Sequence, residues 1–338
     1  MVRSLGMPEG LEHKIDKALK NRMPCPSQRT HNLRKGWGSA NYCQFALSFK
    51  CEHEKGLAIF DSGDLAYINK QIVCDYRPKE IKYISVTGAS SKEDVDNIMK
   101  IFKKYGVRMD KDIIPAIGFQ VMRANLQGSE EYSMRNAHVK ELKHLIKGDF
   151  FAMLHYNSST EDGYYKEIEQ LLDICGPNMD CTRIQVNNRG RLKSWHEIYH
   201  IKEYHPEIDI CLQVPPNKLE IPREKVVDKL KKYSHVIDSI IIDDSRGKGE
   251  KLPVDDVIDF YKEVRYKIGE VGIVIAGGLD GDIVKEDVKK IVDAVGNDIS
   301  VDAEGKLRDQ VGEKRGEDVL NYYRVEEYVK AAVEVLCR

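Results

Sequence analysis

Two adjacent acidic residues directly follow a short apolar run, a position that suits acid–base chemistry. Asp243 and Asp244 come after the run Ile240 to Ile242. Because neighbouring residues of a strand point to opposite faces, one carboxylate is expected to face the interior of the fold and the other the outside. A carboxylate in a water-poor place beside a second acid, here Glu304, has a raised pKa, as a general acid requires. The pair predicts a catalytic acid, and an Asp that caps the following loop is the structural alternative.

Glycines after the next two apolar runs predict an anion-binding site. Gly277 and Gly278 follow the run that begins at Val271, and Gly305 follows the run that begins at Ile299. Glycines let backbone N–H groups approach a phosphate, and a helix that starts nearby, close to Ile283, adds the positive end of its dipole. Further polar residues near the ends of the runs are expected to bind the substrate or its phosphate: His155, Gln185, Asn187, Arg246, Lys248, Lys306 and Arg308.

Glu304 conflicts with an anion at this place. Its negative charge would repel a phosphate unless a cation such as Lys306 or Arg308 screens it. Either one of these cations neutralises Glu304, or the ligand is not an anion at this point.

Eight short apolar runs must position these residues. They are rich in β-branched residues, a pattern typical of strands buried on both faces of a parallel sheet. Helical segments lie between runs, as in Val254 to Ile268 and Ile283 to Val295. This rhythm predicts a (β/α)8 TIM barrel over residues 81–338, with its site at the carboxyl ends of the strands. The runs are Tyr83 to Val86, Ile113 to Phe119, Phe150 to Leu154, Thr182 to Val186, Ile208 to Val214 and those beginning at Ile240, Val271 and Ile299.

Residues 1–80 are expected to form an N-terminal extension of the barrel. It contains a basic arm, Asn21 to Trp37, and a β-hairpin, Gly56 to Asn69. The arm is interpreted as a solvated segment or a cap, with contact to an anionic ligand or RNA as the functional alternative. Cys25, Cys43 and Cys51 lack the paired spacing of a zinc knuckle, so no metal is expected there.

Three motifs, in this order, resemble the C-terminal part of phosphoribosylanthranilate isomerases, which are (β/α)8 enzymes of tryptophan biosynthesis. They are Asp243-Asp244-Ser245, Ala276-Gly277-Gly278-Leu279 and Val301-Asp302-Ala303-Glu304-Gly305. At the start of the barrel, Val86-Thr87-Gly88-Ala89-Ser90 precedes Glu93-Asp94 at the spacing of the family. The resemblance implies the fold and a site at the ends of these strands.

The same resemblance implies an altered active site. The general acid of the family corresponds to Asp244, with Asp243 beside it, and its catalytic cysteine corresponds to Thr87. An alcohol cannot act as a base at neutral pH without help. Ala303 and Glu304 replace two serines that help hold the phosphate in the family. We therefore expect little or none of the family's own activity.

His196-Glu197-Ile198-Tyr199-His200 matches the H-E-x-x-H motif of zinc metallopeptidases. Charged residues follow at Lys202 and Glu203, and the segment falls where the fourth barrel helix must lie, outside the ring of strands. A coincidence on a helix surface is the main interpretation, and a zinc peptidase is a minor alternative.

The composition sets broad limits. The chain has 338 residues, 41% of them apolar and 32% charged, with a net charge of −2 and eight cysteines. No apolar run approaches the ~18 residues of a membrane span. We expect a soluble, cytoplasmic protein with reduced thiols, no membrane contact and no general affinity for nucleic acid.

These observations predict an isomerase- or lyase-type enzyme that acts on a small, phosphorylated sugar-like ligand without a cofactor. The proposed catalytic residues are Asp243, Asp244, Thr87 and Glu304. The alternative is a non-catalytic barrel that binds a ligand or partner through its mouth, with RNA contact through the basic arm.

Overall fold

The structure is a computed structural model that describes most of the chain after residue 80. The described residues are 81–129, 133–158, 163–176, 182–186, 192, 194–205, 208–217, 219–243, 253–269, 271–313 and 316–337. The chain divides into two units, Met1–Lys79 and Glu80–Arg338. The predicted basic arm and β-hairpin lie outside the described residues, and so do the cysteines of residues 1–80.

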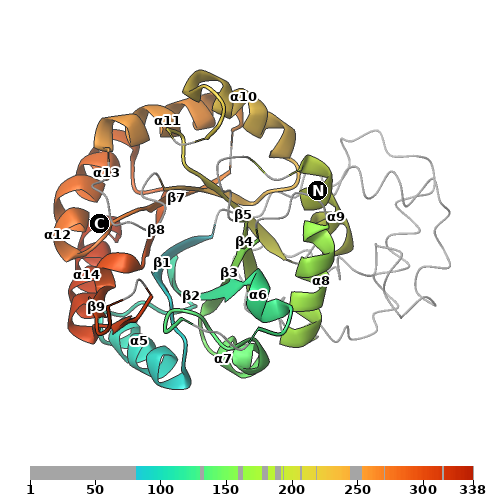
Figure 1. Cartoon of the computed structure of the whole chain (residues 1–338). Coiled ribbons are helices and arrows are strands. Elements are labelled where there is room, and N and C mark those ends of the chain that lie inside the picture. Colours follow the sequence, from blue (N-terminus) through green and yellow to red (C-terminus); the bar gives the residue numbers. More distant parts are fainter. Residues whose placement is uncertain are drawn as a thin grey trace, which may run out of the picture. The chain divides into compact units, whose positions relative to one another are not determined.

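Eight parallel strands form a closed barrel in chain order, and β1 pairs with β8 to close it (Figure 1). This architecture confirms the predicted (β/α)8 TIM barrel. The strands are β1 Lys82–Thr87, β2 Ile113–Met122, β3 Phe151–Asn157, β4 Thr182–Val186, β5 Asp209–Val214, β6 Ser239–Ile242, β7 Gly272–Ala276 and β8 Ser300–Ala303.

Helices surround the ring of strands (Figure 1). The longer ones are α5 Lys92–Lys104, α8 Tyr164–Cys175, α9 Trp195–Tyr204, α11 Val254–Lys267 and α14 Tyr322–Leu336. A continuous helical stretch follows β7, with α12 Gly281–Ile283, a π-helical turn η5 Val284–Val288 and α13 Lys289–Val295. Shorter elements are α6 Arg123–Leu126, η2 Val139–Glu141, α7 Leu142–Leu145, η3 Arg223–Lys225, α10 Val226–Leu230, η4 Lys231–Tyr233, η6 Gly305–Leu307 and the hairpin strands β9 Arg308–Gln310 and β10 Asp318–Leu320. In this part of the chain, no helix is both long and apolar enough to cross a membrane.

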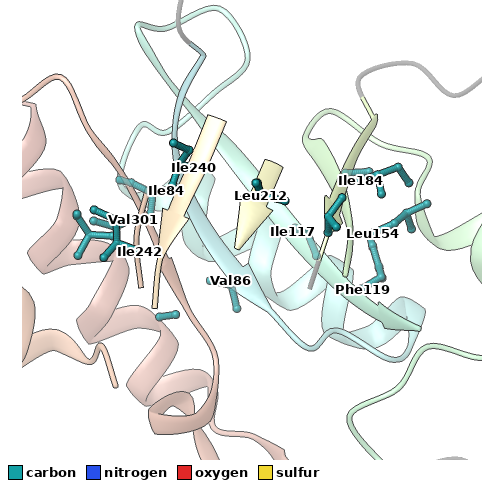
Figure 2. Packing of buried hydrophobic residues seen from close by; sticks show 14 of the residues in the cluster. Ile84, Val86, Ile117, Phe119, Leu154, Ile184, Leu212, Ile240, Ile242 and Val301 are labelled. Carbon is teal, nitrogen blue, oxygen red and sulfur yellow. The ribbon is translucent and has the colours of Figure 1, made fainter. Parts of the chain in front are cut away.

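The strands bury both faces, which is why their sequences read as nearly continuous apolar runs. Side chains on the outer face, such as Ile84, Val86 and Leu154, belong to the large core between strands and helices (Figure 2). The alternate positions of the same strands face the lumen of the barrel. The apolar lumen residues are Tyr83, Ala116, Phe151, Met153, Cys211, Ile241, Val274 and Ala276.

A buried arginine lies toward the amino ends of the strands. The guanidinium carbon of Arg183 is 5.0 Å from the ring centre of Tyr83 and 4.9 Å from that of Phe151. One Nη donates a hydrogen bond to the Tyr83 hydroxyl at 2.9 Å, and the other lies 3.7 Å from the Asp209 carboxylate. Such aromatic and ionic contacts hold a cation in a dry interior. The positive charge of Arg183 therefore lies inside the barrel, where it acts on groups nearer the carboxyl ends.

Candidate active site

Polar side chains occupy the lumen at the carboxyl ends of the strands. Each is less than one tenth exposed, although its strand neighbours are apolar. The structure brings together four residues that the sequence singles out and adds two further side chains, from β5 and β8. The cluster consists of Thr87, His155, Gln185, Gln213, Asp243 and Asp302.

Asp302 on β8 is a buried carboxylate without a predicted catalytic role. The Thr87 hydroxyl donates a hydrogen bond to Asp302 Oδ1 at 2.8 Å. Burial raises the pKa of Asp302 from 3.8 to about 7, and the charges of Glu304 and Asp243 act in the same direction. At neutral pH this carboxyl group therefore exchanges readily between its acidic and basic forms, as a general acid or base must.

His155 completes a hydrogen-bonded chain with Thr87 and Asp302. Its Nε2 lies 3.3 Å from Thr87 Oγ1. Because the only hydroxyl proton of Thr87 is donated to Asp302, a hydrogen bond here requires that His155 Nε2 carries a proton. Burial, together with the smaller effect of the Arg183 charge, lowers the pKa of His155 to about 3. The imidazole is thus neutral at physiological pH, with its proton on the nitrogen that faces Thr87.

Gly118 on β2 makes room for this chain of hydrogen bonds. A Cβ atom at Gly118 would lie 2.1 Å from Thr87 Oγ1 and 2.9 Å from His155 Nε2. Only a residue without a side chain fits at this position. A glycine inside an apolar strand is a sequence signal for such a close approach.

Of the two adjacent acidic residues, Asp243 lies in the lumen. Its Oδ2 accepts a hydrogen bond from Gln213 Nε2 at 2.7 Å. Asp244 lies outside the described residues, together with Asn187, Arg246 and Lys248. The candidate site is therefore built around Asp243 and Asp302.

Glu304 is paired with a cation that the sequence did not indicate. Arg135, in the segment between β2 and β3, donates from Nη1 to Glu304 Oε1 at 3.1 Å. Arg135 also donates from Nε to both carboxylate oxygens of Asp318, at 2.9 and 2.8 Å. Burial raises the pKa of Glu304, and the charges of Arg135 and Arg308 lower it. Arg135 comes from an irregular loop without a pattern of its own, so only the folded chain shows its role.

Arg308 and Lys306, two of the predicted phosphate contacts, lie in different environments. Arg308 is buried, and its Nε donates to Asp318 Oδ1 at 2.5 Å. Its Nη1 donates to the Gly88 carbonyl oxygen at 3.0 Å, so the guanidinium is used within the fold. The side chain of Lys306 is exposed. Among these residues, Arg135 supplies the hydrogen-bonded counter-charge of Glu304, and Arg308 adds a weaker field.

The glycines of the predicted anion site have the backbone freedom that such a site uses. Gly277 and Gly278 have φ angles of 101° and 63°, a region that side chains disfavour. The helix after them begins at Gly281, and the carboxylate of Asp280 accepts the N–H of Ile283 at 2.9 Å. A protein carboxylate therefore already occupies this helix N-terminus. Gly305 begins the short helical turn η6.

The H-E-x-x-H segment forms α9 on the outside of the barrel. Glu197 accepts hydrogen bonds from the N–H groups of Gly163, at 3.1 Å, and Tyr165, at 2.7 Å, at the start of α8. His200 Nδ1 lies 3.3 Å from a Glu203 oxygen. The described residues contain no cluster of three or more His, Cys, Asp or Glu side chains suited to a metal ion. Glu197 thus caps a neighbouring helix, which is a structural role.

No protein-family model matches the chain, and no curated protein matches its sequence. Similar solved structures include TrpF from Jonesia denitrificans, at 13% identity and a TM-score of 0.47, covering 76% of this chain and 98% of that one. Another is a designed cube-shaped protein cage made by fusing symmetric oligomeric domains, at 9% identity and a TM-score of 0.43, covering 76% and 72% of the two chains. Structural similarity at these identities and TM-scores supports no statement about the function of this barrel.

Proposed function

We propose that the barrel is an isomerase- or lyase-type enzyme that transfers a proton on a small sugar-like ligand, with Asp302 as the general acid and base. The observation that supports this proposal is a buried carboxyl group at the carboxyl ends of the strands with a pKa of about 7. Perturbed pKa values of this kind are typical of catalytic acids and bases.

The proposed reaction uses both forms of Asp302. The ionised carboxylate takes a proton from the hydroxyl-bearing carbon next to a carbonyl group, and the electron pair moves onto the carbonyl oxygen to give an enediolate. The hydroxyl proton moves from the first carbon's oxygen to the former carbonyl oxygen, and the protonated Asp302 returns its proton to the former carbonyl carbon. The product is an isomer, and no electrons are gained or lost. Thr87 holds Asp302 Oδ1 in place through its hydroxyl, at 2.8 Å.

The proposal changes one role expected from the sequence. Thr87 cannot be the base, because an alcohol keeps its proton at neutral pH. The chain provides a base on β8, seven strands after β1 in the sequence but adjacent to it in the closed barrel, since β1 pairs with β8. Asp243, hydrogen-bonded to Gln213, stays in the proposed site as the second carboxylate.

The test is solvent deuterium exchange by the full-length chain. A panel of aldoses and ketoses, each with and without a phosphate group, is incubated with the protein in D₂O and followed by NMR for loss of the C–H signal next to the carbonyl. We expect exchange with at least one compound, and a loss of roughly 10²–10⁴-fold in Asp302→Asn, the usual contribution of a general acid or base. Asp110→Asn, at an exposed site, is the matched control.

Two outcomes would contradict the proposal. The first is equal exchange rates in Asp302→Asn and the unmodified chain. The second is a compound that binds in calorimetry but shows no exchange and no conversion, which would instead support the non-catalytic binding barrel.

A further inference from the structure

We propose that the innermost part of the candidate site binds an uncharged, hydroxyl- or carbonyl-bearing part of the ligand, and that the side-chain amide of Gln185 recognises it. This inference rests on the proposed function and names the chemistry that the site selects. It places any charged group of the ligand outside the innermost part.

Gln185 carries a buried polar atom without a partner in the described part of the chain. Its side chain is 4% exposed, and its Oε1 accepts no hydrogen bond from these residues. The strand neighbours Ile184 and Val186 belong to the outer core, so Gln185 faces the lumen. Leaving a buried acceptor unsatisfied costs about 1–3 kcal/mol. We therefore interpret Gln185 Oε1 as an acceptor for a hydrogen-bond donor of the ligand.

The side chains beside Gln185 toward the carboxyl ends are uncharged hydrogen-bonding groups, while Arg183, two residues earlier on the same face, is bonded to Tyr83 and paired with Asp209. In the strand register, Gln185 lies beside His155 on β3 and Cys211 on β5. His155 is neutral, and Thr87 and Gln213 are uncharged groups of the same cluster. Such a lining matches hydroxyl and carbonyl groups, which donate and accept hydrogen bonds without carrying charge.

The charges of the site argue against a deeply bound anion. The guanidinium groups of Arg135 and Arg308 are bonded to Asp318, and Arg135 also to Glu304. The helix N-terminus after β7 is capped by Asp280. A phosphate pushed among Asp243, Asp302 and Glu304 would meet carboxylates, which repel it when they are ionised. An uncharged polar group avoids this repulsion.

The test compares Gln185→Met and Gln185→Glu with the unmodified full-length chain. Met keeps the length of the side chain and removes its amide, whereas Glu keeps an acceptor and introduces a charge. The probes are free aldoses, ketoses and polyols, and their monophosphates, measured by calorimetry. Tyr266→Ser, at a side chain that is 89% exposed, is the control variant.

We expect the unmodified chain to bind at least one uncharged compound, and Gln185→Met to weaken that binding about tenfold, the effect of one lost hydrogen bond. We also expect Gln185→Met to melt at the same temperature as the unmodified chain or higher, because it removes an unsatisfied buried acceptor. A merely structural glutamine would lower the melting temperature instead.

Three results would overturn the inference. They are binding of monophosphates alone with no effect of Gln185→Met, a lower melting temperature of Gln185→Met with unchanged binding, and no binding of any uncharged compound. Failure of the proposed function looks different, because deuterium exchange would then be absent or independent of Asp302 while the Gln185 variants still altered binding.

Discussion

At the scale of single residues, Asp302 and His155 respond to burial in opposite directions. Both side chains are buried in the lumen, where the charged form of either group is disfavoured. The pKa of Asp302 rises from 3.8 to about 7, and the pKa of His155 falls from 6.5 to about 3. Through most of the pH range between these values, the folded protein keeps both groups uncharged.

This opposition predicts how stability depends on pH. Between about pH 4 and 6.5 the unfolded chain has Asp302 ionised and His155 protonated, whereas the folded chain keeps both groups uncharged. As pH rises, the difference at Asp302 lowers the free energy of unfolding and the difference at His155 raises it. The two contributions nearly cancel in the unmodified chain. Asp302→Asn should therefore gain up to about 3 kcal/mol between pH 4 and 6.5 relative to the unmodified chain, at about 1.4 kcal/mol per pKa unit.

His155→Gln should show the opposite slope. Only the contribution of Asp302 then remains, and the free energy of unfolding should fall by up to about 3 kcal/mol between pH 4 and 6.5 relative to the unmodified chain. Urea titrations across this pH range measure both variants. Parallel pH profiles of the two variants would show that the lumen does not shift these groups.

Thr87 leads to a prediction about the family that the sequence resembles. The unmodified chain is not expected to complement a tryptophan auxotroph, because Thr87 stands at the position of the catalytic cysteine. Growth of the auxotroph with the unmodified gene would refute this, whereas growth only with Thr87→Cys would support the correspondence of positions.

At the scale of elements, one arginine joins the segment between β2 and β3 to the β9–β10 hairpin. Arg135 bonds to Asp318 on β10, and the N–H of Met134 donates to the Gly316 carbonyl at 3.0 Å. Arg308, on β9, also donates to the Asp318 carboxylate. Burial raises the pKa of Asp318, yet its hydrogen bonds to the two arginines outweigh burial and hold the pKa below its ordinary value.

Arg135→Ala should destabilise the protein by about 2–4 kcal/mol, because it leaves Glu304 partly buried without its cation. Arg135→Lys should recover only part of this loss, since an ammonium group cannot reproduce the forked geometry of a guanidinium. Urea unfolding measures both. Arg324→Ala, at a half-exposed ion pair with Asp309, should cost under about 1 kcal/mol. Equal losses at the two arginines would contradict this account.

The hydrogen bonds between α8 and α9 allow a test of the role of the H-E-x-x-H motif. Glu197→Ala should cost about 1 kcal/mol, the usual value of a lost helix cap, because the N–H groups of Gly163 and Tyr165 lose their acceptor. His200→Ala should change stability far less. Thermal melts with zinc or with a chelator should be the same for all these proteins, and a zinc-dependent shift that His200→Ala abolishes would restore the metal interpretation.

At the scale of the whole molecule, the barrel is complete within the second unit of the chain. All eight strands and the closing pair of β1 and β8 lie after Glu80. We therefore predict that a chain of residues 80–338 folds by itself and melts cooperatively, as judged by circular dichroism. A truncated chain without a cooperative transition would show that residues 1–79 supply part of the fold.

The sequence by itself determined the architecture, because the signal for it is local and repeated. Eight apolar runs with polar ends suffice to predict a barrel with its site at the carboxyl ends of the strands. The position of Thr87 at a strand end follows from the same pattern. The cap at Asp280 was also accessible, since an Asp directly before a helix is a start signal, but the helix was expected to begin two residues later than Gly281.

Only the tertiary structure decided which polar groups meet. Thr87 and Asp302 are 215 residues apart in sequence and 2.8 Å apart in space, because β1 closes the barrel against β8. Arg135 reaches Glu304 from a loop without periodicity. The pKa of Asp302 depends on how much water the finished lumen excludes and on which charges surround it, and both quantities exist only once the barrel has closed.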